Sequence, residues 1–208
     1  MKILQIIKDI CPDKLPKNIS SFIAGGAEGE VYSVKEYPDR VIKLSLLYDL
    51  DRKTDILYRY NDLEKIFNFI MDEKPNHIVG LHKYNLVYFG KRNTDIGYQD
   101  YMVYFYEMDK LENISDDEYK VFHTIISHED FNKEKNYSVK ELKNILKKLH
   151  HGLDFSEEDI IMFYLSLRKW PILHNDLHPR NIMKSLDGNF RLIDLDSCKI
   201  QYRYQLNK

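Results

Sequence analysis

The first half of the chain alternates short apolar runs with turn-forming residues and contains one longer helical pattern. The apolar runs are rich in branched and aromatic residues, which predicts strands joined by tight turns. Five strands are expected. The first ends near Ala24, and the others cover residues 30–36, 40–46, 85–90 and 101–108. From Thr54 to about Met71, apolar residues recur at the spacing of one helix face. These patterns predict an antiparallel sheet accompanied by one amphipathic helix.

The second half of the chain is predicted to be mainly helical. Three helices are expected, over 115–127, between Ser138 and Gly152, and between Ser156 and Pro171. Ser138 and Glu141 have the spacing of a capping box, in which each satisfies a backbone amide of the other. The polar segment 132–137 is expected to be a loop between helices.

A hairpin with polar residues at its open end is predicted after these helices. Two apolar runs flank the turn 185–189, which is rich in Asp, Gly and Asn. Asn181 begins the first strand and Asp194 follows the second, so antiparallel pairing brings the two together. Their amide and carboxylate oxygens suit one hard cation. Asp176 precedes them in a loop that Pro179 is expected to keep extended, where it can accept a proton.

A glycine-rich turn lies between the first two expected strands, over residues 24–31. Gly25, Gly26 and Gly29 lack a Cβ, so backbone amides can approach a phosphate there. The same glycines would also suit an ordinary hairpin turn. Lys43 lies in the third expected strand among apolar residues, where its charge needs an anionic partner or an exposed edge position.

Glu64 is the candidate partner for this lysine. It lies on the apolar face of the expected helix, four residues after Tyr60 and three before Phe67. Most other charges of this helix fall elsewhere. Glu64 therefore either pairs with Lys43 or lies at the edge of the apolar stripe with its carboxylate in water.

Two motifs of the chain resemble those of the protein-kinase-like superfamily. The spacing His174-x-Asp176-Leu177-x-x-x-Asn181 is similar to its catalytic loop, and Asp194 stands where its metal-binding aspartate would be. The turn over 24–31 is similar to its glycine loop, with an alanine at the first glycine position.

The resemblance covers about residues 20–197 and implies an α+β fold of two lobes. The N-terminal lobe, about 20–108, would be an antiparallel sheet with one helix, and the C-terminal lobe, 109–208, would be small and mainly helical. Both lobes would belong to a single kinase-like domain of residues 1–208.

The resemblance also implies that the chain binds ATP and Mg²⁺ and transfers the γ-phosphate to a hydroxyl group. Asp176 would be the catalytic base, Lys43 paired with Glu64 would hold the phosphates, and Asn181 and Asp194 would hold Mg²⁺. The residues expected to contact the nucleotide, including a hinge that bonds adenine through main-chain atoms, are Gly25, Gly26, Gly29, Val31, Val41, Lys43, Glu107, Asp109 and Met183.

Several departures from the family pattern leave the acceptor open. Asn175 replaces the arginine of H-R-D, and Leu195-Asp196 replaces the last two residues of D-F-G. Asp196 would then either assist the metal or cap the next turn. The sequence of residues 176–179 is closer to aminoglycoside and choline kinases than to protein kinases. Twelve residues follow Asp196, so the A-P-E motif and a peptide-docking platform are not expected, as in compact atypical kinases such as the RIO type.

Three functions therefore compete. An atypical serine/threonine protein kinase is favoured, with a partner protein completing the short C-terminal lobe. A small-molecule kinase is the second, and an acidic pocket would suit a cationic metabolite; the candidates are Glu112, Asp116, Asp117 and Glu118, which would otherwise form a solvated helix start. The third is a nucleotide-binding regulatory module without transfer activity.

Composition agrees with an intracellular globular protein. A net charge of −2 predicts no general attraction to nucleic acid or anionic membrane. The two cysteines, Cys11 and Cys198, lie near opposite ends without metal spacing and are expected to be reduced thiols. His174 and His178 are four residues apart, but Pro179 argues against a helical zinc pair. Neither a signal-peptide core nor a bilayer-length apolar run is present, so we expect a cytoplasmic location.

Overall fold

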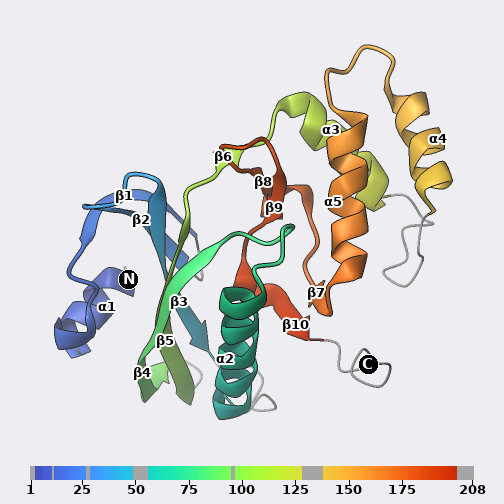
Figure 1. The fold of residues 1–208 in the computed structure, drawn as a ribbon. Coiled ribbons are helices and arrows are strands. Elements are labelled where there is room, and N and C mark those ends of the chain that lie inside the picture. The colour runs from blue at the N-terminus through green and yellow to red at the C-terminus, as the bar shows by residue number, and fades with distance from the viewer. Residues whose placement is uncertain are drawn as a thin grey trace. The chain divides into compact units, whose positions relative to one another are not determined.

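The computed structural model describes residues 3–10, 12–26, 29–48, 56–94, 97–127 and 138–200. By contacts the chain divides into two compact units (Figure 1). Unit 1 comprises Met1–Lys74 and Gly80–Lys110, and unit 2 comprises Pro75–Val79 and Leu111–Lys208. The mixed α+β class with an antiparallel sheet is confirmed. No helix within the described ranges is both long and apolar enough to cross a bilayer.

Unit 1 is built on a five-stranded antiparallel sheet in the order β1-β2-β3-β5-β4. Its strands are β1 (Ile19–Gly25), β2 (Gly29–Val34), β3 (Arg40–Tyr48), β4 (Leu81–Thr94) and β5 (Gly97–Asp109), and its helices are α1 (Ile3–Ile10), the 3₁₀ turn η1 (Pro12–Lys14) and α2 (Ile56–Glu73). All five strands were expected, but β4 and β5 are longer than expected because they pair with each other as far as Thr94 and Gly97. The expected start of α2 at Thr54 lies outside the described residues.

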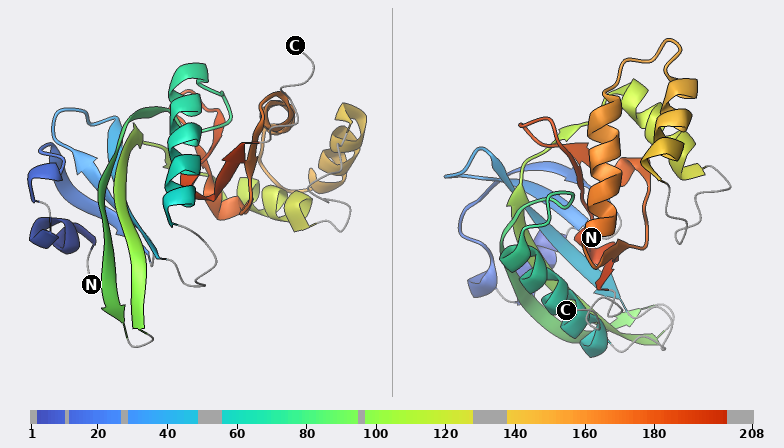
Figure 2. Two further views of the ribbon diagram at one scale, coloured as in Figure 1. Left: turned by 90° about the horizontal axis from the view of Figure 1, so that it is seen from below. Right: turned by 45° about the vertical axis from the view of Figure 1, so that its right-hand side comes forward.

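The two helices of unit 1 cover opposite faces of this sheet (Figures 1 and 2). On one face, Ile3, Ile6 and Ile7 of α1 pack into the main apolar cluster with strand residues such as Ile42 and Phe105. On the other face, Phe67 of α2 packs against rings of β4 and β5. Each face of the sheet is therefore buried by its own helix.

Glu30 of β2 fixes the start of α1. Its two carboxylate oxygens accept the backbone amides of Ile3 and Leu4, each at 3.0 Å, so they cap the helix. Tyr32 donates its hydroxyl to the same carboxylate at 2.9 Å. Burial first, and then this bond, raise the pKa of Tyr32 to about 12. The sequence interpretation missed α1 entirely.

Unit 2 combines three helices with short strands. The helices are α3 (Asp116–Ser127), α4 (Val139–Leu149) and α5 (Glu157–Lys169), and the strands are β6 (Glu112–Asn113), β7 (Ile172–His174), β8 (Ile182–Lys184), β9 (Phe190–Leu192) and β10 (Cys198–Ile200). Single 3₁₀ turns occupy η2 (Pro179–Asn181) and η3 (Leu195–Ser197). The capping box of Ser138 with Glu141 is confirmed, as is the hairpin β8–β9. Residues 132–137 lie outside the described residues.

The core of unit 2 joins its helices to the hairpin. Phe122 of α3 is fully buried, and its ring centroid lies 5.6 Å from that of Phe163 in α5 and 4.9 Å from that of Phe190 in β9. Outside the hairpin, β7 pairs antiparallel with β10. Cys198 in β10 is buried, whereas Cys11 lies outside the described residues.

Candidate functional site

Gly29, which follows the glycine turn of unit 1, lies against the side chain of Lys43. Gly25 ends β1 and Gly29 begins β2, and the amide of Gly26 donates to the carbonyl of Gly29 at 2.9 Å. A Cβ on Gly29 would lie 2.8 Å from Cε of Lys43, whereas a Cβ on Gly26 would meet nothing within 4 Å. A side chain at position 29 would therefore have to displace the end of the Lys43 side chain.

Lys43 lies on the face of the sheet that α2 covers. It is opposite Val31 on β2 and Tyr106 on β5, and cross-strand partners point to the same face. Its Nζ lies 5.6 Å from the centroid of the Tyr106 ring. That ring in turn lies 5.4 Å from Phe67 of α2. Val41, two residues before Lys43 on β3, shares this face.

Glu64 extends from α2, one turn before Phe67. Its Oε1 accepts the hydroxyl of Tyr60 at 3.1 Å, and the carboxylate is partly buried. Burial first and the Glu64 bond second raise the pKa of Tyr60. Lys43 and the helix that carries Glu64 thus share one face of the sheet, and the direct pair between them stays a prediction.

The side chains of Glu107 and Asp109 are engaged within unit 1. Glu107 accepts from Arg40 at 3.0 Å, and this bond is the main reason that the pKa of Arg40 is raised. Asp109 accepts from Nε2 of His82 at 2.7 Å and lies so close to Gly80 that any Cβ there would collide with it. The amide of Asp109 donates to the carbonyl of Gly80 at 3.0 Å. The amide of Asp109 is therefore already hydrogen-bonded within unit 1. Adenine binding at this hinge stays a prediction.

In unit 2, Asn181 holds Asp176 through two hydrogen bonds. Its Nδ2 donates to the carbonyl of Asp176 at 2.9 Å and to Oδ2 of the same residue at 3.1 Å. The sequence predicted an extended loop between these two residues. This prediction is wrong for part of the loop, because Pro179–Asn181 forms a 3₁₀ turn. Proline begins such a turn without loss, since its missing N–H has no partner there. His178 accepts the amide of Arg180 at 3.1 Å and caps the turn.

Asp194 follows β9 beside Asn181. The amide of Ile193 donates to the carbonyl of Asn181 at 2.9 Å, so Asn181 and Asp194 lie at the same end of the hairpin, as predicted. Asp194 has a left-handed backbone, with φ 61° and ψ 57°. Ser197 donates its hydroxyl to Oδ2 of Asp194 at 3.1 Å. A non-glycine residue in this region is uncommon and is often held there by a functional requirement.

The donors at this end of the hairpin fit a hard cation. Nδ2 of Asn181 is directed to Asp176, and an amide oxygen and a carboxylate are ligand types that Mg²⁺ takes together with phosphate oxygens and water. That Asn181 and Asp194 hold one Mg²⁺ stays a prediction. Across the described residues, no group of three or more His, Cys, Asp or Glu side chains is arranged to hold a metal. Asp196 lies inside η3, whose N-cap is Asp194, so it does not cap that turn. A role for Asp196 as a ligand stays a prediction.

Two of the four acidic residues considered as ligands of a cationic metabolite already form ion pairs and hydrogen bonds within unit 2. Glu118 is buried, forms an ion pair with Lys184 at 2.6 Å, and accepts the amide of Ser115 at 2.8 Å. Asp117 accepts the amide of Asp154 at 3.0 Å and the amine of Lys120 at 3.0 Å. Asp116 and Glu112 are exposed. These contacts weaken the prediction of an acidic pocket.

Three residues around the predicted groups were not assigned a role from sequence. Tyr106 lies beside Lys43, Ser197 bonds Asp194, and His174 donates from Nε2 to the carbonyl of Ile193 at 2.8 Å. The Ser197 contact had a local signal, because a hydroxyl three residues after an aspartate often bonds it. The other two contacts depend on strand pairing.

Met183 lies in β8, opposite Arg191 of β9 and Asn113 of β6, and is partly exposed. Its predicted contact with adenine stays a prediction.

In comparisons with known proteins, no protein-family model matches the chain, and no curated protein matches it.

Proposed function

We propose that the chain is an ATP- and Mg²⁺-dependent phosphotransferase that moves the γ-phosphate of ATP to a hydroxyl group. The observation that carries this proposal is the pair of hydrogen bonds that Asn181 donates to Asp176. A further hydrogen bond, from the amide of Ile193 to the carbonyl of Asn181, keeps Asp194 beside Asn181. This arrangement supplies one proton acceptor and one pair of cation ligands from a single short segment.

Asp176 is the base in this proposal. Its Oδ2 accepts from Asn181, and within the described residues no bond involves Oδ1, so that oxygen can take the proton of the acceptor hydroxyl. As the hydroxyl oxygen attacks the γ-phosphorus, the bond from phosphorus to the bridging oxygen breaks and ADP leaves with the electron pair. Bound Mg²⁺ would neutralise the charge that develops on the phosphate oxygens.

Unit 1 supports the nucleotide part of the proposal. Gly29 lies against Lys43, and Val31 and Val41 share its face of the sheet, so apolar surface adjoins an amine as a base and its phosphates require. The antiparallel sheet with α2 and the mainly helical unit 2 also agree with the two lobes that the resemblance implies.

We propose a serine or threonine hydroxyl of a protein as the acceptor, and a small-molecule hydroxyl is the second candidate. The engagement of Asp117 and Glu118 within unit 2 disfavours a site for a cationic metabolite. The sequence of residues 176–179, which is closer to small-molecule kinases, keeps the second candidate open.

The test is to incubate the chain with γ-labelled ATP and Mg²⁺, alone, with a mixture of unfolded proteins, and with aminoalcohols and aminoglycosides. Label on the added proteins or on the chain itself supports the first acceptor, and label on the small molecules supports the second. Tight ATP binding without any label transfer, including transfer to water, would contradict the proposal and favour a regulatory module.

A further inference from the structure

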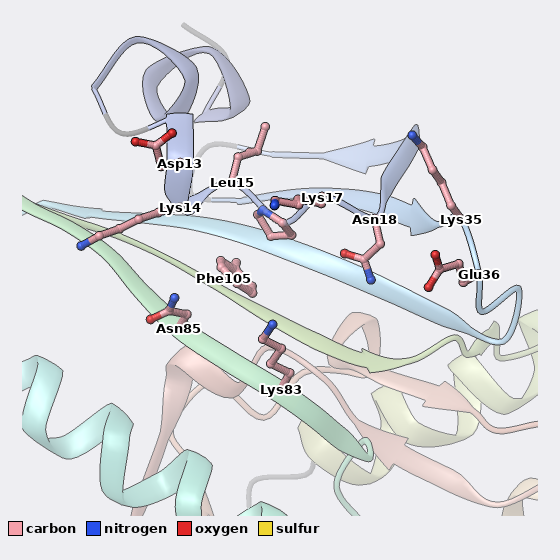
Figure 3. A pocket seen from close by; sticks show the side chains of 11 residues that line it. Asp13, Lys14, Leu15, Lys17, Asn18, Lys35, Glu36, Lys83, Asn85 and Phe105 are labelled. Atoms are coloured by element: carbon pink, nitrogen blue, oxygen red, sulfur yellow. The ribbon is translucent and has the colours of Figure 1, made fainter.

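A pocket of about 540 Å³ opens on the face of unit 1 away from Lys43 (Figure 3). Phe105 of β5 forms its floor, and Leu15 and Pro16 form one wall. Phe105 occupies the opposite face from Tyr106 and Lys43, because neighbouring residues of a strand alternate. The pocket is thus separate from the groups assigned to ATP, and the inference about it stands whether or not the chain transfers phosphate.

Four lysines surround this pocket, and they come from separate parts of unit 1. Lys14 and Lys17 come from the segment before β1, Lys35 follows β2, and Lys83 comes from β4. All four side chains are exposed, and within the described residues none has an ion-pair partner. In Figure 3 the side chain of Lys83 rises toward the segment that carries Lys17 and Asn18.

The charge of the pocket is opposite to that of the whole chain. Four lysines face two acids, Asp13 and Glu36, whereas the chain as a whole carries a net charge of −2. The amides of Asn18 and Asn85 also line the pocket and can donate hydrogen bonds. A bound anion would supply ion-pair partners to these lysine amines, which have none within the described residues.

Backbone bonds hold the wall of the pocket in place. The amide of Leu15 donates to Pro12 at 3.1 Å, and the amide of Ile19 donates to Pro16 at 3.3 Å. The amide of Lys35 donates to the carbonyl of Asn18 at 2.9 Å, which joins the segment to the end of β2. Leu15 also packs against the core beneath α1. A pocket formed before binding loses little entropy when it takes a ligand.

From these features we infer that the pocket binds a small organic or inorganic polyanion with at least two phosphate or carboxylate groups. The volume lies in the range of small-molecule sites, roughly 300–1,000 Å³, which favours a compact ligand over a long acidic peptide. Phosphate and carboxylate share the chemistry that lysine amines and asparagine amides recognise.

The test is calorimetric titration with inorganic pyrophosphate, citrate and hexaglutamate, without Mg²⁺ and at low salt. The pocket variant Lys17→Glu/Lys83→Glu is compared with the matched control Lys65→Glu/Lys147→Glu, whose exposed lysines lie outside the pocket. We expect pyrophosphate or citrate to bind, the pocket variant to lose at least about tenfold in affinity, and the control to change by less than about twofold. Glu36→Gln should tighten binding, because it removes a negative charge and keeps the shape.

Amide chemical shifts locate the probe. The largest shifts are expected at Lys17, Lys83 and Asn85. Three results would overturn the inference: no binding of pyrophosphate or citrate, equal losses in pocket and control variants, or the largest shifts at the glycine turn 25–29. Preferential binding of hexaglutamate would replace the small polyanion with an acidic peptide.

Discussion

Substituting Gly29 with alanine should disable the proposed phosphate lysine without unfolding unit 1. The new Cβ would lie 2.8 Å from Cε of Lys43, and ordinary contact begins at about 3.4 Å, so Cε must withdraw by about 0.6 Å (3.4 − 2.8). The carbonyl of Leu44, at 3.4 Å, leaves the backbone little disturbed. Because the clash is with a flexible side chain, the free energy of unfolding should change by less than about 1 kcal/mol.

The functional loss should be much larger than the loss of stability. Displacements approaching 1 Å in a positioning group can lower rates by about a hundredfold, so we expect kcat/KM for ATP to fall by about tenfold to a hundredfold. ADP release and thermal unfolding are measured for Gly29→Ala and for wild type. An unchanged kcat/KM for ATP in Gly29→Ala would refute the assignment of Lys43 as the group that holds the phosphates.

Two further predictions concern unit 2. Phe122→Ala should lower the free energy of unfolding, measured by urea denaturation, by about 3–5 kcal/mol, because Phe122 is fully buried. The control Met162→Ala should lower it by less than about 0.5 kcal/mol, because Met162 is exposed. Similar losses in the two variants would refute the proposed core. Burial first and the charge of Arg191 second lower the pKa of His77 to about 4, below its value of 6.5 when unfolded. The unfolded state therefore binds the proton first, so stability should fall as pH drops from 6.5 toward 4, by up to roughly 3 kcal/mol. Urea unfolding of His77→Phe at pH 7 and 5 should show a smaller decline than wild type, and an unchanged decline would contradict this assignment.

Elements with local signals were predictable from the sequence. The capping box of Ser138 specified the start of α4, and the turn 185–189 specified the hairpin β8–β9. The helix α1 also had a signal, since Ile3, Ile6 and Ile7 follow helical spacing, but eight residues are too few for a stable helix without the sheet and the cap from Glu30.

Features that depend on distant pairing were not predictable. The strands β7 and β10 have three residues each and form only because His174 is opposite Cys198, 24 positions later. The use of Glu118 as an ion-pair partner of Lys184 similarly joins segments 66 positions apart. For the candidate site, the sequence predicted the proximity of Asn181 and Asp194, whereas the bond of Asn181 to Asp176 required the fold of the loop.

The most direct test of the account is a comparison of Mg²⁺-dependent ATP binding and phosphate transfer in wild type, Asp176→Asn and Asp194→Asn. Asp176→Asn keeps the shape of the side chain and removes the proton acceptor, so we predict nearly unchanged affinity for Mg·ATP and a loss of turnover of at least about a hundredfold. Asp194→Asn should instead lose the Mg²⁺-dependent part of ATP binding. Full turnover in Asp176→Asn, or Mg²⁺-dependent binding that survives in Asp194→Asn, would contradict the account.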